Sequence, residues 1–360
     1  MVRLDVAVIG AGQAGLAIAG HLRGSGLRVT LFDRAERVGD SWRCRWDSLR
    51  LFTPARYSQL RGLPFPGSGD RHPGKDEVAD YLAAYAAQVG APVEVGVEVT
   101  ELAAAESGDG FTLVTSGGRS WTAGQVVVAT GPFQEPVRPA FAARLDAGVV
   151  QVHSHDYRNP AQVPAGGPIV VVGRGNSGVQ IAAELVAAGR DVVLAGRAQP
   201  YLPQRILGRD VFWWLHRPGL LHAPTGSWRG RLLRRRGEPV IGTDVGRLVR
   251  AGRVRLVPQA VDANGRWLCF DGGQRLAVAA VVWATGYRPH YPWLRLPVLD
   301  AAGRPEHRRG VTAVPGLYFV GLPWQSQRGS ALLDGVDRDA YRLARTIVAR
   351  DAGVSADTLG

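Results

Sequence analysis

The sequence has few of the residues from which thiol-based centres are built. Only two of its 360 residues are cysteines, Cys44 and Cys269, and they lie far apart in the chain, outside any C-x-x-C pattern. A disulfide framework or a redox-active dithiol requires paired cysteines, so the sequence argues against both. Among redox enzymes, this absence disfavours the disulfide reductases, which pass electrons to a thiol pair.

Long apolar runs are missing as well. No stretch approaches the roughly 20 uncharged apolar residues that a membrane-spanning helix needs, and the first residues run straight into a strand pattern without the organisation of a signal peptide. The composition, 46% hydrophobic and 21% charged, is typical of a soluble globular protein. We therefore expect a cytoplasmic protein, and the length suggests two domains.

Lysine is almost absent: Lys75 is the only one, and the net charge of +12 comes from arginine. The excess is concentrated in residues 199–255, which hold twelve arginines and three acidic residues. No nucleic-acid-binding motif accompanies this charge, so we expect no nucleic-acid partner. Arg229, Arg231 and Arg234–Arg236 most simply form a solvated face; contact with a membrane surface or an anionic substrate is the weaker alternative.

One supersecondary pattern occurs twice in the chain. The first copy runs from an apolar strand at residues 4–9 through the sequence GAGQAG and a helix to about residue 23, and ends in a strand at 28–33. The second copy has a strand at 169–172, the sequence GRGNSG, a helix to about residue 188 and a strand at 191–195. Each copy is the start of a βαβ unit, so the sequence predicts an α/β fold with two Rossmann-like dinucleotide-binding domains.

The rest of the chain is more varied. The expected elements are a turn-rich segment at 39–74, helices over 76–88 and 335–349, and strands over 93–99, 111–115, 125–129, 279–284 and 317–320. Residues 199–255 are expected to form an irregular insert with basic and aromatic character. Within it, Phe212, Trp213 and Trp214 either line a substrate tunnel or pack as a plain helix face, and core packing is the commoner use of such stretches.

Each glycine of the G-x-G-x-x-G sequence has a physical reason in this context. The first glycine permits a tight turn, the second allows the backbone to approach a pyrophosphate, and the third allows the helix to pack on the strand. The free N–H groups and the positive dipole end of the helix then bind the phosphates. The predicted contacts are Gly10, Gly12, Gln13, Ala14 and Gly15 at the first site, and Gly173, Gly175, Asn176, Ser177 and Gly178 at the second.

The two copies differ at the end of the second strand. The first ends in Asp33, followed by Arg34, and a carboxylate at this place accepts hydrogen bonds from ribose hydroxyls and repels a 2′-phosphate. The second ends in Gly196-Arg197, and a guanidinium there binds a 2′-phosphate. The first site is therefore predicted to bind FAD or NAD, and the second NADPH. The alternative is that Asp33 and Arg197 only cap their strands.

Two further strands end in the same tripeptide, Ala129-Thr130-Gly131 and Ala284-Thr285-Gly286. A glycine just past a buried strand marks a sharp turn or a close approach of the backbone to a ligand. One tripeptide precedes the second βαβ unit and the other follows it. We interpret them as paired crossings between two nucleotide-binding domains.

Several shorter segments accompany these motifs. They are Gly39-Asp40-Ser41-Trp42, Leu49-Arg50-Leu51-Phe52-Thr53-Pro54, Leu63-Pro64-Phe65-Pro66, Tyr81-Leu82, His153-Ser154-x-x-Tyr157, Ala284-Thr285-Gly286-Tyr287 and Gly316-Leu317-Tyr318-Phe319. Together with the two glycine-rich sequences, they make the chain resemble the flavin-containing monooxygenases along nearly its whole length. The resemblance is greatest to the short bacterial members and to the plant YUCCA-type enzymes.

This resemblance implies a discontinuous FAD domain, residues 1–160 and 287–360, and an inserted NADPH domain, residues 161–286, that carries the insert at about 199–255. Ser41, Trp42, Arg50 and Thr53 are expected to line the isoalloxazine or its linker, and the segment at Gly321 to close over the ring. The further expected contacts are Arg34, Val99, Ala129, Thr130 and Gly131 for FAD, and Thr285 and Gly286 for NADPH.

The resemblance also implies a reaction. The chain is expected to be an FAD-dependent, NADPH-consuming monooxygenase that forms a C4a-peroxyflavin and oxygenates a small organic substrate with O2. Bound NADP⁺ would shield that intermediate from water. No side chain need act as a nucleophile, so no catalytic residue is assigned. The alternatives are an NADPH-dependent reductase or oxidase that passes electrons to a partner or to O2, and a redox sensor without catalysis.

The substrate stays open at this point. Oxygenation of an amine or thioether, oxidative decarboxylation of a keto acid and Baeyer–Villiger chemistry are all known from the family. Ala147 and Val149 stand where the family's linker has Phe and Gly, and Pro54 stands close to the active-site Asn of the animal enzymes, as it does in the plant enzymes. Tyr157 is the monooxygenase-type residue rather than the Trp of Baeyer–Villiger enzymes. The oligomeric state is not defined by the sequence.

Two other candidates have simpler interpretations. His153 and His155 lack the cysteine or carboxylate neighbours of a metal centre, so we expect a linker histidine with a structural hydrogen bond and no bound metal. Cys44 lies near the predicted flavin pocket, but an isolated thiol is usually a small packing residue.

Overall fold

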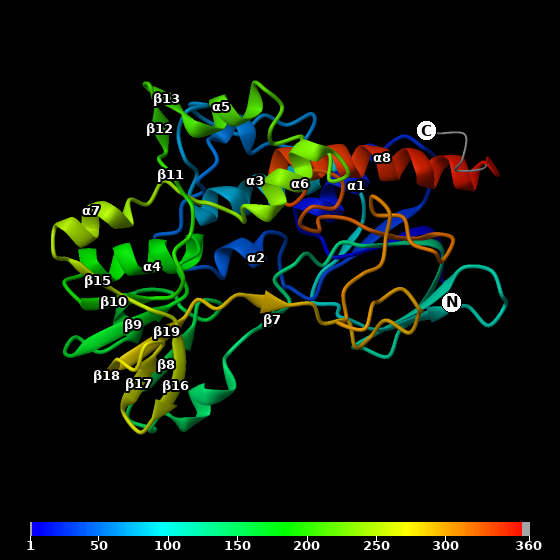
Figure 1. Cartoon of the computed structure of the whole chain (residues 1–360). Helices are drawn as coiled ribbons and strands as arrows, with labels where there is room; N and C mark the ends of the chain where they lie inside the picture. The colour runs from blue at the N-terminus through cyan, green and yellow to red at the C-terminus, as the bar shows by residue number, and fades with distance from the viewer. Residues whose placement is uncertain (1, 355–360) are drawn as a thin grey trace.

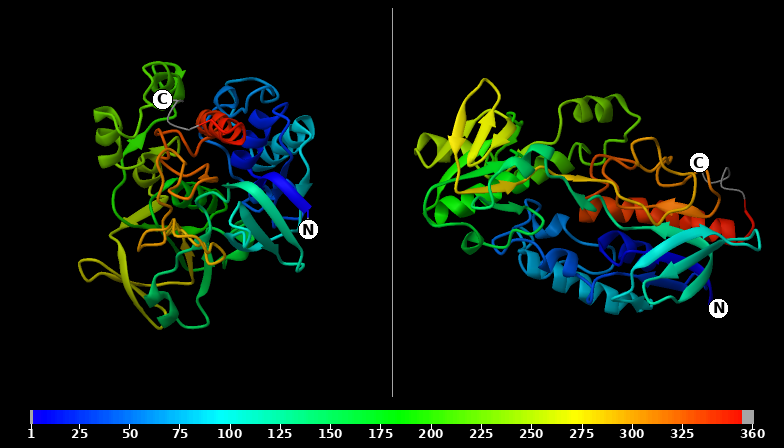
Figure 2. Two further views of the ribbon diagram at one scale, coloured as in Figure 1. Left: turned by 90° about the vertical axis from the view of Figure 1, so that its right-hand side faces the viewer. Right: turned by 90° about the horizontal axis from the view of Figure 1, so that it is seen from below.

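The computed structural model describes residues 2–354, which form two α/β bodies lying side by side (Figures 1 and 2). The first body contains the start of the chain and its last helix. The second body is built from the middle of the chain, so both connections to it pass through the centre of the molecule. No helix within residues 2–354 is long and apolar enough to cross a membrane.

The first body is built on a seven-stranded sheet. Its strands are β1 (Val2–Ile9), β2 (Val29–Phe32), β3 (Val93–Glu94), β4 (Val99–Ala104), β5 (Phe111–Thr115), β6 (Ser120–Val128) and β21 (Leu317–Phe319). The order is β3-β2-β1-β6-β5-β4; β5 pairs with the first half of β6 and β21 with its second half. The strands around β1 are parallel and buried on both faces, as the continuous apolar runs predict.

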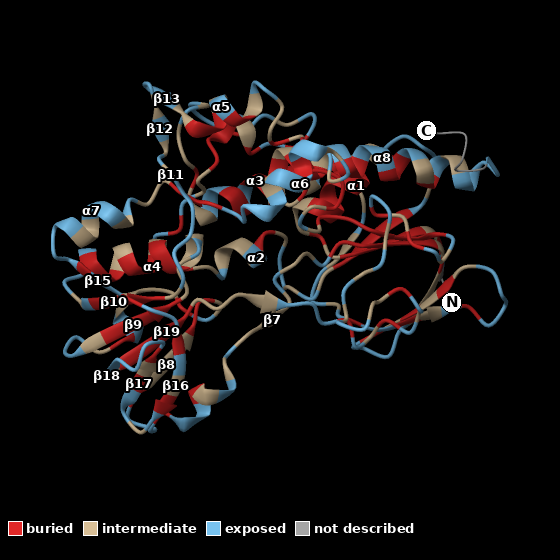
Figure 3. Cartoon of the chain, viewed as in Figure 1, coloured by how far each residue is buried: buried red, intermediate tan, exposed pale blue. Residues whose placement is uncertain are grey.

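Three helices cover one face of this sheet. They are α1 (Gln13–Leu22), α3 (Lys75–Val89) and α8 (Leu333–Asp351), and their buried side chains form one cluster with those of β1. Figure 3 marks the buried residues of these helices in red. The opposite face is covered by the loop that contains Tyr291, Leu294 and Val298. The helices predicted over 76–88 and 335–349 are thus confirmed within two residues at each end.

The second body has a five-stranded, fully parallel sheet. Its strands are β8 (Val150–His153), β9 (Pro168–Val172), β10 (Asp191–Ala195), β15 (Val254–Val257) and β19 (Ala280–Trp283), in the order β15-β10-β9-β19-β8. Helices α4 (Asn176–Ala187) and α7 (Val245–Arg250) cover one face. The other face packs on η2 (Ala140–Arg144) and on the small sheet of β16 (Ala260–Asn264), β17 (Trp267–Phe270) and β18 (Arg275–Ala277).

The chain enters and leaves the second body along two adjacent segments. β7 (Glu135–Pro136) follows the first Ala-Thr-Gly tripeptide, β20 (Tyr287–Arg288) follows the second, and the two pair antiparallel. The backbone N–H of Val137 also donates to the carbonyl of Gly286 at 3.0 Å. The predicted paired crossing is therefore present. The second body, however, begins before the expected domain boundary at residue 160, because β8 precedes that residue and hydrogen-bonds to β19 in the second body.

The insert is more regular than expected. It contains β11 (Tyr201–Leu202), β12 (Arg205–Ile206), β13 (Arg209–Asp210), α5 (Val211–His216), α6 (Trp228–Arg235) and β14 (Val240–Ile241). Asp210 caps α5 by accepting from the N–H of Phe212, and Ser227 caps α6 by accepting from the N–H of Gly230. These caps stabilise helices that are too short to show a clear apolar period.

The strand expected over 93–99 is in fact two separate strands, β3 and β4. Gly96 lies between them with a φ of +65°, a left-handed conformation that turns the chain and ends the first strand. The strand expected from residue 125 begins earlier, at Ser120, because its first half pairs with β5.

Candidate functional site

The first glycine-rich turn joins β1 to α1 and is shaped by backbone contacts. Gly10 has a φ of +106°, and a Cβ atom there would lie 2.7 Å from the carbonyl oxygen of Ala129. A Cβ atom at Gly15 would lie 1.9 Å from the carbonyl oxygen of Gly10. A Cβ atom at Gly12 would meet nothing within 4 Å. Two of the glycines are thus required by the fold, while Gly12 leaves open space in front of the helix.

The second turn, between β9 and α4, repeats this arrangement. Gly173 has a φ of +118°, and a Cβ atom there would lie 2.2 Å from the carbonyl oxygen of Ala284. A Cβ atom at Gly178 would lie 1.9 Å from the carbonyl oxygen of Gly173, whereas one at Gly175 would meet nothing. The alanine of each Ala-Thr-Gly tripeptide is therefore the residue against which the first glycine packs.

Both helices begin without a side-chain cap. α1 has Gly12 and α4 has Gly175 at the N-cap position, and within the described residues no side chain accepts a hydrogen bond from either first turn. Such uncapped N–H groups, next to the open space at Gly12 and Gly175, are suited to hold the phosphates of a dinucleotide.

The side-chain amides of Gln13 and Asn176, one in each turn, bind elsewhere in the chain. Gln13 donates through Nε2 to the carbonyl of Ala331 at 3.0 Å, which ties the start of α1 to the segment before α8. Asn176 accepts from the N–H of Ile241 at 2.9 Å and donates to the carbonyl of Pro239 at 3.2 Å, which ties the insert to α4. Only their backbone groups are left to contact phosphate.

Asp33 lies at the mouth of the first turn. Its Oδ2 accepts from the N–H of Ala11 at 2.7 Å and its Oδ1 from the N–H of Ala35 at 2.9 Å. The carboxylate is half-buried and held in place by the backbone, while the neighbouring Arg34 is exposed. Val99 is buried in the core of the first body, which leaves its backbone as the accessible part.

Arg197 is exposed at the end of β10, as predicted, and a second arginine accompanies it. Arg174, the residue between the first two glycines of the second turn, donates through Nη1 to the carbonyl of Gly196 at 3.4 Å. Its Cγ would lie 3.3 Å from a Cβ atom at Gly196. The sequence prediction did not include Arg174, because it occupies a variable position of the glycine motif. A second arginine in the motif that precedes Arg197 is the signal that could have indicated it.

The predicted flavin-lining residues are divided between different surroundings. Ser41 and Trp42 lie in α2 (Asp40–Arg43), where Trp42 packs against the cores of both bodies. Thr53 is buried and accepts a hydrogen bond from the hydroxyl of Ser58 at 2.8 Å. Arg50 is exposed, and its guanidinium donates to the carbonyl of His72 at 3.2 Å, so its side chain is bound away from Thr53.

Gly321 lies against the start of α1. Its φ is +83°, and a Cβ atom there would lie 2.7 Å from the Cβ of Ala14. The segment after β21 thus passes over the first glycine-rich turn. In the two tripeptides, the hydroxyl of Thr130 accepts from the amide of Gln134 at 2.9 Å, and the hydroxyl of Thr285 donates to the carbonyl of Val137.

A solvent-accessible hollow of about 570 Å³ lies next to this segment. It is lined by residues of the insert, of the loop before β21 and of the segment after β21, with Arg234, Arg308 and Arg309 as its cationic groups. Arg309 and Trp324, which also lines it, have φ values of +54° and +57°. A non-glycine residue rarely adopts this conformation, and such strain concentrates at functional sites.

The linker histidine has the structural hydrogen bond that the sequence predicted. Nδ1 of His153 accepts from the N–H of His155 at 3.0 Å, and the ring packs edge-on against Tyr287, with 5.4 Å between centroids. Burial lowers the pKa of His153 to about 4, so the ring is neutral. Tyr157, also fully buried, donates to Oε2 of Glu184 at 2.8 Å.

The aromatic stretch of the insert is split between two environments. Phe212 is buried, stacks on Phe52 and lines a small cavity together with Thr53. Trp213 is packed between the guanidinium groups of Arg209 and Arg217, and Trp214 is partly exposed. Phe212 thus packs in a core cluster, as the helix-face interpretation expects, and the tunnel interpretation stays a prediction. Cys44 is exposed and Cys269 lies in β17; both are free thiols.

The chain matches known proteins over nearly its full length. The model of the pyridine nucleotide-disulphide oxidoreductase family matches residues 7–206. The chain is 42% identical, over 96% of its length and 98% of the relative, to the uncharacterized oxidoreductase CzcO-like of Geobacillus kaustophilus. It is 30% identical, over 94% of its length and 90% of the relative, to the indole-3-pyruvate monooxygenase YUCCA1 of rice, Oryza sativa.

Solved structures give the same result. The flavin-containing monooxygenase from Stenotrophomonas maltophilia superposes with a TM-score of 0.81 and 30% sequence identity. The match covers 98% of this chain and 100% of the other. Both bodies and the crossing between them are thus included in the likeness.

Proposed function

The chain belongs to the flavin-containing monooxygenases, FAD- and NADPH-dependent oxidoreductases within the pyridine nucleotide-disulphide oxidoreductase family, and we propose that its first glycine-rich turn binds FAD and its second NADPH. The observation that carries the proposal is the pairing of two turns of the same geometry with opposite charges at the strand end. Asp33 stands at the first turn, and Arg197 with Arg174 stands at the second.

At the first turn, the uncapped start of α1 would hold the FAD pyrophosphate, and Asp33 would bind the ribose hydroxyls. Its carboxylate already points at the turn, since Oδ2 accepts from the N–H of Ala11. A 2′-phosphate at this place would meet a fixed negative charge, which favours FAD over NADPH. The FAD domain of this proposal is the first body, where Gly321, whose segment passes over the turn, and Thr53 would enclose the flavin ring.

At the second turn, Arg197 and Arg174 would share the 2′-phosphate of NADPH. Two guanidinium groups at one strand end offer several charge-assisted hydrogen bonds to a dianionic group. The NADPH domain of this proposal is the second body. Because β8 belongs to its sheet, we place its limits at the β7 and β20 crossing rather than at residue 161.

Bound FAD would supply the redox chemistry, taking two electrons from NADPH and passing them to O2, so that one oxygen atom goes to the substrate and the other leaves as water. The chain offers the electrons no thiol pair, because Cys44 and Cys269 lie in different bodies and are free. Trp42, packed between the two cores, helps to keep water out where the bodies meet.

The hollow beside the segment after β21 favours an acidic substrate. Its three arginines would attract a carboxylate and oppose the approach of a protonated amine. This supports a small organic acid rather than an amine as the substrate. The test is a comparison of an aromatic keto acid with its neutral methyl ester: NADPH-dependent oxygen uptake coupled to product should occur with the acid, and equal rates would contradict the proposal.

The monooxygenase step itself is tested by rapid mixing. The enzyme is reduced with NADPH without oxygen and then mixed with O2, and the flavin absorbance is followed. A persistent peroxyflavin spectrum supports the proposal. Direct return to oxidised flavin with stoichiometric release of peroxide would instead indicate the alternative, a reductase or oxidase.

A further inference from the structure

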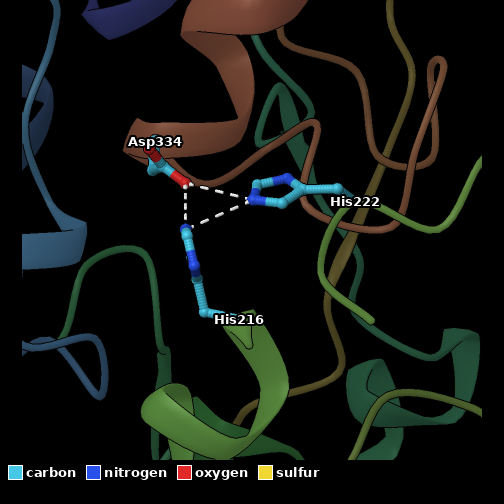
Figure 4. Close-up of side chains that lie close together, drawn as sticks. All are labelled: His216, His222 and Asp334. Atoms are coloured by element: carbon cyan, nitrogen blue, oxygen red, sulfur yellow. Dashed lines mark hydrogen bonds and ion pairs between the residues drawn. The ribbon is translucent and has the colours of Figure 1, made fainter. Parts of the chain in front are cut away.

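Three potential metal ligands converge between the insert and the last helix (Figure 4). His216 is the last residue of α5, His222 follows it in the insert, and Asp334 lies in the first turn of α8. The Nε2 atoms of the two histidines are 3.4 Å apart, and each lies 3.7 Å from Oδ2 of Asp334. Within residues 2–354 this is the only group of three such side chains that meets in this way.

These distances fit a shared ion better than direct hydrogen bonds. A hydrogen bond to a carboxylate spans about 2.7–3.2 Å, so 3.7 Å is too long for one. Ligand atoms held about 2.0–2.1 Å from a tetrahedral Zn²⁺ lie roughly 3.3–3.4 Å from one another. A pair one turn further along α8 gives the contrast: Asp337 contacts His21 directly, at 3.0 Å.

The surroundings also fit an ion with one open position. His222 is 13% exposed, whereas Asp334 and His216 are 35% and 36% exposed. His222 and Asp334 border a cavity of about 10 Å³, lined also by Thr53 and Tyr57, which is the room that one water-sized particle needs.

We propose that His216, His222 and Asp334 bind a divalent transition-metal ion, Zn²⁺ in preference to Mg²⁺, with water completing the site. Two imidazoles and one carboxylate are a ligand set for zinc and its neighbours, whereas Mg²⁺ takes oxygen ligands and retains its waters.

The ion would tie two parts of the molecule together. Two ligands come from the insert and the third from α8 of the first body. These parts also meet through the apolar cluster around Phe212 and Leu332 and through backbone hydrogen bonds to the segment before α8, such as that from the N–H of Gly329 to the carbonyl of Leu221 at 2.8 Å. The ring of His216 stacks on Tyr57, with 5.0 Å between centroids, so the ion would also fix the insert beside the segment of Thr53. The positive charge of Arg338 acts on His222 and would repel a cation bound there. We therefore expect the site to bind Zn²⁺ with moderate affinity. The proposed metal site depends on these three ligands alone and does not depend on which turn binds FAD.

Calorimetry with Zn²⁺ tests the proposal on the full-length flavin-loaded protein, without an affinity tag and after treatment with a chelator. We expect one Zn²⁺ per chain, no binding of Mg²⁺, and a Tm that rises with Zn²⁺ concentration. Co²⁺ at the same site should give the intense visible absorption of four-coordinate cobalt. If this protein, without any substitution, fails to bind Zn²⁺, or if it binds Mg²⁺ equally well, the proposal is overturned.

Variants identify the ligands. Loss of a group that merely supports a metal ligand costs about 10–100-fold in affinity, so Asp334→Ala and His222→Ala should each weaken Zn²⁺ binding by at least about 100-fold. Asp337→Ala, which removes the neighbouring carboxylate of the same helix, is the matched control and should bind Zn²⁺ as the parent does. Asp334 is half-exposed, so its variant decides the matter if His222→Ala does not fold. Unchanged Zn²⁺ affinity in Asp334→Ala contradicts the assignment.

Discussion

The two glycine-rich turns share their backbone geometry and differ in the charge at the end of the second strand. In each, the first glycine packs on the carbonyl of an alanine in the neighbouring strand and the third packs on the carbonyl of the first. Asp33 faces one turn, and Arg174 with Arg197 face the other. The comparison teaches that backbone space determines whether such a turn forms, whereas the proposed choice of nucleotide depends on one or two side chains.

The largest expected effect tests the shared part. Gly15→Ala and Gly178→Ala each place a Cβ atom 1.9 Å from a carbonyl oxygen, so the helix must move from its strand. We expect each to lower the free energy of unfolding by about 3 kcal/mol or more, the upper range for overpacking, measured by urea denaturation. If either variant keeps the parent's unfolding midpoint, the steric account of the turns is wrong.

An acid-stability experiment tests a property of the second body that the first lacks, because His153 lies in the second body. Its pKa is about 4 when folded and about 6.5 when unfolded, so the unfolded chain binds the extra proton between these values. Stability should therefore fall as the pH drops from about 6.5 to 4, by up to roughly 3 kcal/mol from this group. His153→Gln should lose that part of the pH dependence, measured by urea denaturation at pH 7 and 5. A parallel dependence in both proteins would contradict it.

The charged strand ends carry the next effect. Arg197→Ala and Arg174→Ala should each weaken NADP⁺ binding by about 10–100-fold, since a hydrogen bond to a charged group contributes about 1.5–3 kcal/mol. Binding of NAD⁺ should be unchanged, because it lacks the 2′-phosphate. Arg255→Ala, on the neighbouring strand and paired with Asp191, is the control. Titration of flavin fluorescence measures both affinities, and an equal loss for NAD⁺ would show a purely structural role.

The smallest effect concerns the open glycines. Gly12→Ala and Gly175→Ala add a methyl group where the structure leaves space, so we expect unfolding midpoints like the parent's. Gly12→Ala should lower FAD affinity, and Gly175→Ala NADP⁺ affinity, by about tenfold, or ~1.4 kcal/mol. The two variants should not exchange their effects; if Gly175→Ala released FAD instead, the assignment of the cofactors to the turns would be reversed.

Much of the fold could be predicted because its signals are local. A buried strand, a glycine motif and a helix follow one another within some twenty residues, and the structure has α1 and α4 where those signals place them. The Ala-Thr-Gly repeats indicated the crossing because each of the two bodies needs an alanine carbonyl at the end of a strand to pack on the first glycine of its turn.

The parts that could not be predicted depend on contacts between distant residues. β8 is a short strand with no pattern of its own, and only its pairing with β19 places it in the second body. Arg174 donates to the carbonyl of Gly196 and Arg50 to the carbonyl of His72, two contacts that no local pattern of the sequence indicates. The meeting of His216 and His222 with Asp334 depends on how the insert packs on α8, which no local spacing reveals.

The β7 and β20 crossing has a consequence for how this architecture changes over time. Its two segments are hydrogen-bonded neighbours, with the N–H of Val137 donating to the carbonyl of Gly286, so the second body begins and ends at nearly the same point in space. A body with adjacent ends can be excised, transplanted or rejoined end to end with little disturbance to its host. We therefore expect that residues 137–286 can be replaced as a unit while the host body keeps its own fold, and that the coenzyme preference proposed for this body would change with them.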